Sequence, residues 1–345
     1  MARQILNTLY VMTPHSYLHL ENDTLRVDVE REKKLQVPLH HLGSVVCLGN
    51  IMVSPALMHR CADDGIALVF LDGNGRFKAR LEGAVSGNIL LRQAQHRQAG
   101  DAAFALHAAR AMIAGKLRNA RQVLLRGARE AADEADAKAL AAGATALRAS
   151  VRNLPLAADL DSVRGIEGDA AKAYFSALNN VVRRDARSTF TMDGRTRRPP
   201  RDRMNALLSF LYSMLMNDCR SALEAVGLDP QLGFLHAVRP GRAALALDLM
   251  EEFRAVMADR LVLTLINRGQ IGAGDFIERE GGAVLLEGDA RRAVVIAYQE
   301  RKQEEITHPL LETKMPIGLL PQIQARLLAR HIRGETETYL PFLAR

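Results

Sequence analysis

The sequence of 345 residues has no tryptophan and three cysteines, Cys47, Cys61 and Cys219. Because the cysteines are an odd number, lie far apart and form no CxxC pair, we expect reduced structural thiols rather than a zinc or redox centre. No run approaches the ~18 apolar residues of a transmembrane helix, and Met1–Pro14 lacks the charged start and long apolar run of a secretory signal. These absences favour a cytoplasmic protein without membrane contact.

Phosphate-binding loops and a nucleophilic triad are missing as well. Neither a GxxxxGKS nor a GxGxxG pattern occurs, so an ATP or dinucleotide cofactor is not expected. No Ser-His-Asp order stands out. The acids, histidines and arginines are therefore the side chains in which to look for chemistry.

Two patterns divide the chain near residue 87. Short alternating or β-branched runs between turn residues fill residues 1–87 and predict a compact antiparallel sheet domain. From Asn88 the composition changes to Ala, Leu, Arg and Glu, which predicts a helical domain over residues 88–345. The expected fold class is α+β, a small N-terminal β-sheet domain followed by a larger all-helical domain.

The expected elements can be given by their ranges. Strands are predicted at Gln4–Val11, Tyr17–Leu20, Thr24–Glu30, Lys34–Pro38, Ser44–Leu48, Ile66–Leu71 and Arg76–Leu81, with a short helix at Ser54–Asp63. Helices are predicted at Asp101–Arg118, Asn119–Val151, Ser162–Asp185, Pro200–Val226, Leu245–Asn267, Asp289–Gln303 and Thr313–Arg333. A hairpin is expected around Asp275–Leu286, and the tail Glu335–Arg345 is expected to be loose.

Positive charge is concentrated in two segments of a chain whose formal net charge is +7. Arg183–Arg203 holds eight arginines against three aspartates and is broken by Gly and Pro, which favours a mobile basic loop. Ile89–Arg129 holds seven arginines and Lys116 against Asp101, on helical sequence. Arginine forks suit phosphate groups, so a nucleic-acid backbone is the expected anion. A solvated helix face is the alternative for the second segment.

Leu232–Arg254 places a histidine and three acids in one apolar neighbourhood. His236 precedes a Pro-Gly break, after which a predicted helix carries Asp248, Glu251 and Glu252. Asp248 and Glu251 are three residues apart, so they share a helix face on which both side chains can reach one ion. Acids early in a helix also simply complement the macrodipole, and the stretch alone does not separate these two interpretations.

A second unusual stretch, Gly165–Asp169, brackets Glu167 with two glycines. It also describes a plain helix start with an acid as dipole partner. Combined with His236 and Asp248 or Glu251, however, it gives carboxylate oxygens and one imidazole from three segments. That mixture suits Mg²⁺ or Mn²⁺ better than zinc, and beside a basic surface it indicates phosphodiester chemistry.

Three blocks in order resemble a known family, and the resemblance covers nearly the whole chain. They are GIEGDAAKAYF (Gly165–Phe175), RRDARSTFTMDGRTRRPPRDRMNALLSFLYSML (Arg183–Leu215) and LDPQLGFLHAVRPGRAALALDLMEEFR (Leu228–Arg254). Together they are similar to the CRISPR-associated adaptation integrase, the first-numbered Cas protein, in versions from type I systems and specifically subtype I-C. The resemblance implies metal ligands at Glu167, His236 and Glu251, with Asp248 as a further acidic site residue and Glu252 not involved. Where some members carry Asp, this chain has Glu251, whose longer arm puts the details of coordination in doubt.

The resemblance also implies an activity and its partners. The expected enzyme is a Mg²⁺- or Mn²⁺-dependent DNA endonuclease and integrase, in which the 3′ hydroxyl of a captured spacer attacks a phosphodiester of the repeat. It implies a homodimer formed through the β domain and assembled with the small second-numbered Cas protein. The arginines expected to bind DNA phosphates are Arg183, Arg184, Arg187, Arg195, Arg197, Arg198 and Arg201. The alternatives are a generic metal-dependent DNA nuclease and a basic DNA-binding scaffold without activity.

Overall fold

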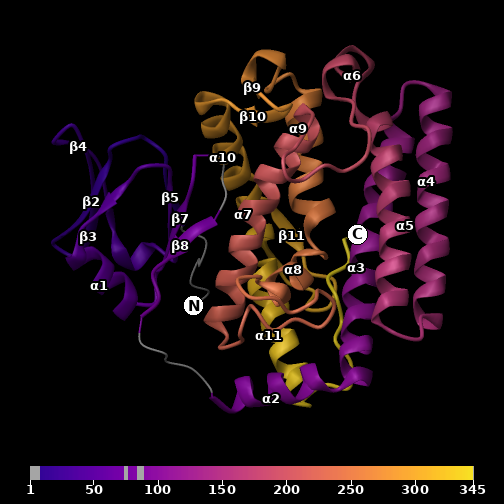
Figure 1. Cartoon of the computed structure of the whole chain (residues 1–345), viewed down its shortest axis with the longest axis horizontal. Helices are drawn as coiled ribbons and strands as arrows, with labels where there is room; N and C mark the ends of the chain where they lie inside the picture. Colours follow the sequence, from indigo (N-terminus) through magenta and orange to yellow (C-terminus); the bar gives the residue numbers. More distant parts are fainter. Residues whose placement is uncertain (1–7, 74–76, 84–88, 345) are drawn as a thin grey trace.

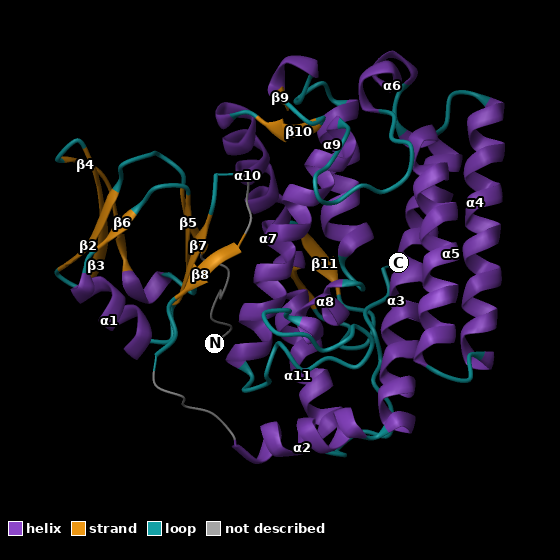
Figure 2. Ribbon diagram, viewed as in Figure 1, coloured by secondary structure: helices purple, strands orange, loops and turns teal. Residues whose placement is uncertain are grey.

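The computed structural model describes residues 8–73, 77–83 and 89–344, which form two parts lying side by side (Figure 1). Most strands gather in the N-terminal part, and helices dominate the remainder (Figure 2). The chain is 56% helical, which confirms a small sheet domain followed by a larger helical region. The boundary expected at residue 87 lies outside the described residues. Within the described ranges, no helix has both the length and the apolar character needed to cross a membrane.

Two four-stranded sheets build the described N-terminal part. Their strands are β1 (Thr8–Val11), β2 (Tyr17–Glu21), β3 (Thr24–Val29), β4 (Glu32–Pro38), β5 (Ser44–Leu48), β6 (Met52–Val53), β7 (Ala67–Leu71) and β8 (Phe77–Arg80). In the order β4-β3-β2-β6, the first two pairings are antiparallel, as expected. In the order β1-β5-β7-β8, the first three strands are parallel, so the antiparallel prediction is wrong there. Helix α1 (Pro55–Asp63) provides the crossover that a parallel return requires.

The parallel sheet is covered on both faces. Along β7, Leu68 belongs to the core of the N-terminal part, whereas Val69 and Leu71 belong to the larger core shared with the helices. Strand β5 alternates in the same way. Since successive side chains of a strand point to opposite faces, burial on both sides explains the uninterrupted apolar runs. This sheet therefore joins the two parts of the molecule.

The helical part surrounds one long buried helix, α7 (Arg203–Ala225), which contributes many residues to the large core. The other helices are α2 (Ile89–Gly100), α3 (Ala102–Glu130), α4 (Glu134–Asn153), α5 (Leu160–Leu178), α6 (Arg184–Phe190), α8 (Ala244–Met250), α9 (Arg260–Asn267), α10 (Gly288–Gln303) and α11 (Leu320–Ile332). The predicted hairpin is present as β9 (Phe276–Arg279) with β10 (Ala283–Leu286). A second ribbon, β11 (Glu305–Thr307) with β12 (Lys314–Pro316), was not predicted.

Several helices begin or end at residues other than those predicted from the sequence. Helix α3 continues through the expected break after Arg118 and ends at Glu130, because the intervening sequence contains good helix formers. Helix α4 begins after Asp133, whose side chain accepts the backbone N–H groups of the next turn. The segment expected to be a mobile basic loop contains helix α6.

The C-terminal tail is docked rather than loose. Tyr339 and Phe342 are 2% and 3% exposed, and the backbone N–H of Ala344 donates to Oδ1 of Asn119 in α3 at 2.8 Å. The backbone N–H of Phe342 donates to Oε2 of Glu252 at 2.7 Å, and Asn119 of α3 donates to the carbonyl of Phe342. The prediction of a loose tail is wrong because these aromatic side chains fill a buried site on the helical core.

Candidate active site

Asp248 of α8 organises the loop that precedes this helix, residues 232–238, which we name the histidine loop. The Asp248 side chain is fully buried, and its oxygens lie 2.7 to 3.0 Å from three backbone nitrogens of the loop, those of Phe234, Leu235 and His236. Gly233 permits this approach, because a Cβ there would lie 2.6 Å from Oδ2 of Asp248. The helix therefore fixes the loop's shape.

Asp248 also orients the imidazole of His236. Oδ1 of Asp248 lies 2.6 Å from Nδ1 of His236. A carboxylate only accepts hydrogen bonds, so Nδ1 carries a proton, and in the neutral ring the lone pair is then on Nε2. Nε2 lies 4.0 Å from Oε1 of Glu251. A histidine held in this way by a carboxylate is the arrangement found behind many metal-bound imidazoles.

Two other helices hold the histidine loop in place. Gln95 of α2 donates to the carbonyls of Asp229 and Leu232 and accepts from the backbone of Asp229. Arg164 of α5 donates from Nε to the carbonyl of Leu235 at 2.9 Å. Because Arg164 lies one turn before Glu167, this bond sets the Glu167 helix against the histidine loop.

Lys116 of α3 links the two glutamates that the sequence analysis singled out. Its Nζ contacts Oε1 of Glu167 and lies 2.7 Å from Oε2 of Glu251. Glu251 is 4% exposed and Glu167 is 26% exposed at the side chain, so Glu167 is at the mouth of the site. Arg254 completes the group with Nη2 at 2.9 Å from Oε1 of Glu251. Its guanidinium lies over the ring of Tyr212, 4.7 Å from the ring centre.

The electrostatics of this group keep Glu251 ionised. Burial alone would raise the pKa of Glu251, but the charges of Arg254 and Lys116, joined by His236 when its ring is protonated, outweigh it and lower that pKa to about 2. An ionised carboxylate with an imidazole 4.0 Å away is suited to binding a cation.

Glu252, the next residue, faces the opposite way. Its carboxylate accepts from the hydroxyl of Tyr339, from Nε2 of Gln324 and from the backbone of Phe342. Burial raises the pKa of Glu252 to about 8, since these neutral donors do not overcome the loss of water. Glu252 therefore holds the tail and stays outside the group formed by Glu251.

The predicted metal ligands are brought together, but with an ammonium group among them. In the part of the chain that the structure describes, no three His, Cys, Asp or Glu side chains are grouped closely enough to hold an ion as they stand. Nζ of Lys116 stands between Glu167 and Glu251, with Nε2 of His236 beside Glu251. Glu167 and Glu251 meet at the ammonium of Lys116, and Nε2 of His236 lies on the other side of the Glu251 carboxylate, 4.0 Å from the oxygen that pairs with Arg254. Carboxylate oxygens with one imidazole nitrogen are donor types that suit Mg²⁺ or Mn²⁺.

Several arginines expected to bind DNA pair with side chains of the chain itself, although Arg183 and Arg184 remain 64% and 66% exposed at the side chain. Arg187 makes a two-pronged pair with Asp136, at 2.9 and 2.7 Å, and burial lowers the pKa of Arg195, which donates to Asn205. Arg183 and Arg184 pair with nearby acids, Asp185 and Asp133. Arg201 is exposed, as are Arg197 and Arg198. The basic segment is thus partly structural.

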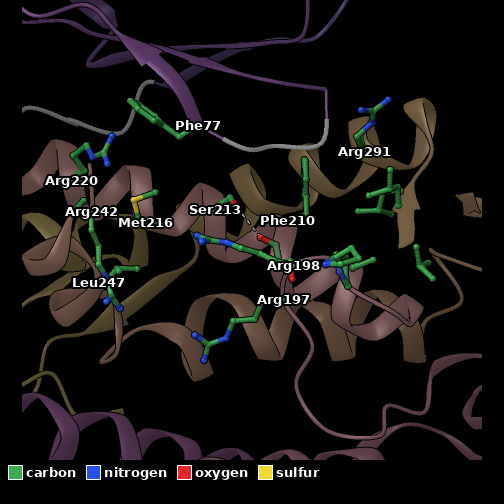
Figure 3. Close-up of a pocket in the computed structure, with 18 of the residues that line it drawn as sticks. Phe77, Arg197, Arg198, Phe210, Ser213, Met216, Arg220, Arg242, Leu247 and Arg291 are labelled. Atoms are coloured by element: carbon green, nitrogen blue, oxygen red, sulfur yellow. Dashed lines mark hydrogen bonds between the residues drawn. The ribbon is translucent and has the colours of Figure 1, made fainter. Parts of the chain in front are cut away.

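Arg197 and Arg198 line a cavity of about 690 Å³ between α7 and the N-terminal part (Figure 3). Its lining includes apolar side chains, among them Phe210 from α7 and Phe77 from β8. Three further arginines line it, and none of the described lining residues is acidic; these arginines are Arg220, Arg242 and Arg291. The guanidinium of Arg220 lies 4.2 Å from the ring centre of Phe77, and burial lowers the pKa of Arg220 to about 10. The cavity suits an anion that carries a flat apolar group.

Lys116 and Arg254 were not predicted as members of the site from the sequence. Arg254 follows Glu251 by three residues, a spacing that indicates a helical ion pair and was available in the sequence. Lys116 was counted as surface charge, because 51 residues separate it from Glu167 and no local pattern links the two.

Comparison with known proteins identifies the family. A family model described as CRISPR associated protein Cas1 matches residues 9–300, which include every residue of the site. A protein of Moorella thermoacetica named CRISPR-associated endonuclease Cas1 1 is 56% identical over 341 residues, covering 99% of both chains. The chain belongs to the Cas1 family.

Solved structures show that the fold extends over both parts of this Cas1 chain. A casposase bound to integration product matches with a TM-score of 0.82 at 20% identity, covering 97% of this chain and 92% of that one. A chain of a Cas6-RT-Cas1–Cas2 complex matches with a TM-score of 0.84 at 23% identity. That match covers 99% of this chain and 36% of the longer chain. The resemblance read from the three sequence blocks is confirmed at the level of the family.

Proposed function

We propose that this Cas1 chain is a divalent-metal-dependent DNA integrase that inserts spacer DNA into a CRISPR repeat. The observation that carries the proposal is that Glu167 and Glu251 meet at one ammonium, with Nε2 of His236 4.0 Å from Oε1 of Glu251. The relative named as an endonuclease and the casposase bound to integration product support a reaction on DNA phosphodiesters.

The chain's own residues would prepare the site for that reaction. Glu167, Glu251 and His236 would hold Mg²⁺ or Mn²⁺, which when bound polarises a phosphoryl oxygen and activates a hydroxyl group. Asp248 would act as a positioning residue, since its oxygens are occupied by the histidine loop and by Nδ1 of His236. Arg254 would keep Glu251 charged and in place. Glu251, rather than Asp248, would therefore contact the ion directly.

The reaction balances without a nucleotide cofactor. The 3′ hydroxyl oxygen of the spacer forms a bond to phosphorus while the bond from phosphorus to a 3′ oxygen of the repeat strand breaks. The attacking hydroxyl loses its proton and the leaving oxygen gains one. One phosphodiester replaces another, so no external energy source is needed.

DNA backbone binding would fall mainly to Arg197, Arg198 and Arg201, with the arginines of the cavity. Replacing Arg197 and Arg198 together by Ala should lower the slope of log affinity against log salt concentration by about 2. The Arg183Ala/Arg184Ala pair serves as the matched control, because those side chains already have acidic partners. An unchanged slope in the first variant would remove Arg197 and Arg198 from the DNA interface.

The assembly belongs to the same proposal. We infer a homodimer that uses the β domain, residues 1–87, while residues 88–345 carry the catalysis, and an assembly with the small Cas2 protein. The matched Cas6-RT-Cas1–Cas2 complex supports the partner. We assign the chain to a type I-C system, acting on DNA in the cytoplasm. Integration in vitro into type I-C repeats, with repeats of another subtype as the control, tests the subtype.

A strand-transfer assay tests the function. Labelled spacer DNA, a leader–repeat target, Cas2 from the same host and Mn²⁺ should give a joined product with the wild type. Spacer that ends in a 3′ deoxynucleotide should give none, because it lacks the attacking oxygen. Cleavage without joining would indicate a generic nuclease instead, and binding without either reaction would indicate a scaffold.

A further inference from the structure

The side chain of Lys116 lies between the two carboxylates of the proposed metal site. Its Nζ pairs with Glu167 from α5 and with Glu251 next to α8, and the side chain is 13% exposed. No hydrogen bond to a backbone carbonyl or a neutral side chain holds this ammonium among the contacts that the structure describes. Its contacts are with the two carboxylates that the proposed function assigns to the ion.

Charge balance explains why an ammonium is needed there. Glu167 and Glu251 would repel each other at this spacing, and Glu251 is buried. Arg254 also pairs with Glu251. The two negative carboxylates and the two positive side chains of Lys116 and Arg254 therefore give the group a formal charge near zero. A divalent cation added to the neutral group would face two positive charges at short range. The favourable arrangement is one in which an ammonium leaves as the ion enters.

Lys116 is the side chain that can leave. Arg254 is 8% exposed and packs over the ring of Tyr212, whereas Lys116 reaches the partly exposed Glu167 at the mouth. Glu167 keeps 26% of its side chain exposed, so the ammonium that pairs with it lies close to solvent. A lysine stem has four rotatable bonds, and its point charge adapts to a new partner.

We propose that Lys116 is a displaceable internal cation that occupies the metal site until the ion replaces it. This inference rests on the proposed function, because it assumes that Glu167 and Glu251 are ligands. Once displaced towards the mouth, Nζ is free to pair with a phosphate oxygen of DNA. Metal and DNA then bind with positive coupling. The ion displaces the ammonium from the glutamates and makes it available to DNA, and DNA that pairs with the ammonium leaves the glutamates available to the ion.

Calorimetric titration of Mn²⁺ into the wild type and Lys116→Met tests the proposal. Removing the competing ammonium should tighten Mn²⁺ binding by roughly 10- to 100-fold. DNA that lacks a reactive 3′ hydroxyl should tighten Mn²⁺ binding to the wild type and have a smaller effect on the variant. Lys138→Met, an exposed change on α4, is the control and should match the wild type.

The outcomes separate this inference from the proposed function. Equal or weaker Mn²⁺ binding by Lys116→Met would show that Lys116 supports the site and does not compete. No binding by the wild type would overturn both the metal site and the competition. If Lys116→Met does not fold, Lys116→Gln provides the same comparison, because an amide carries no charge and can still contact both glutamates. Its Mn²⁺ affinity should also exceed that of the wild type.

Discussion

Glu251 and Glu252 are neighbours in sequence, yet they belong to two different regions of the molecule. Glu251 faces the cationic group of Lys116 and Arg254 and has a pKa lowered to about 2. Glu252 faces the C-terminal tail and has a pKa raised to about 8, with hydroxyl and amide donors around it. Both side chains are buried. Burial therefore does not decide the charge of an acid; the charge of its partners does.

The largest loss of strand transfer should follow from removing the charge of Glu251, the acid beside Lys116 and Arg254. Glu251→Gln keeps the shape but loses the charge, and strand transfer should fall by roughly 1000-fold, about 4 kcal/mol of transition-state stabilisation. Glu252→Gln should stay within about threefold of the wild type, measured in the same assay. Equal losses of strand transfer in the two variants would show that Glu251 and Glu252 do not have separate roles.

A third buried acid, Asp259, should make the stability of the protein depend on pH. Asp259 accepts from the hydroxyls of Tyr174 and Tyr212, and burial raises its pKa to about 6. An acid with a raised pKa stabilises the fold fully below its unfolded pKa, and that contribution is lost as pH rises through the folded pKa. Between pH 4 and 6.5 the wild type should lose about 2 to 3 kcal/mol relative to Asp259→Asn.

Urea unfolding at a series of pH values measures this difference. Asp193→Asn, at an exposed position, is the control and should follow the wild type throughout. A constant difference between the wild type and Asp259→Asn across the range would mean that Asp259 is ionised in the folded protein at pH 4.

A substitution at Asp248 tests whether this residue acts behind His236 or binds the ion itself. Asp248→Asn should weaken the orientation of His236 and lower strand transfer by about 10- to 100-fold, as expected for a residue behind a ligand. Raising the Mn²⁺ concentration should restore part of the rate. A loss as deep as that of Glu251→Gln, without rescue by Mn²⁺, would make Asp248 a direct ligand.

The smallest effect concerns the tail. Tyr339→Phe removes the hydroxyl that donates to Glu252, which should cost about 1 to 2 kcal/mol of unfolding free energy. Tyr17→Phe, at a 40% exposed position, should cost little. Chemical denaturation of the two variants gives the comparison. If strand transfer below the unfolding range fell with Tyr339→Phe as it does with Glu251→Gln, the tail would belong to the site.

The fold was predictable where local patterns carry it. The apolar runs of β5 and β7 and the Gly-flanked hairpin β9-β10 follow from strand propensity and turn residues. The docking of Tyr339 was not predictable, because a short segment with a proline and two aromatic residues gives no periodic signal. Its burial depends on partners such as Glu252, 87 residues earlier in the chain.

Some residues of the candidate site could be predicted from the sequence, and others could not. Glu167, His236 and Glu251 stood out through unusual local composition and the family resemblance. Asp248 was visible too, but its role behind His236 depends on three backbone contacts that spacing does not reveal. Lys116 was hidden, since its partners come from two other helices and a lysine among arginines resembles surface charge.

Anomalous diffraction from crystals soaked in Mn²⁺ tests the central claim most directly. The account predicts one peak in contact with Glu167, Glu251 and Nε2 of His236, with Nζ of Lys116 moved away from both glutamates. Asp248 should still contact Nδ1 of His236, and Glu252 should still hold the tail. A peak coordinated by Asp248 or Glu252, or Mn²⁺ bound elsewhere with Lys116 still between the glutamates, would contradict it.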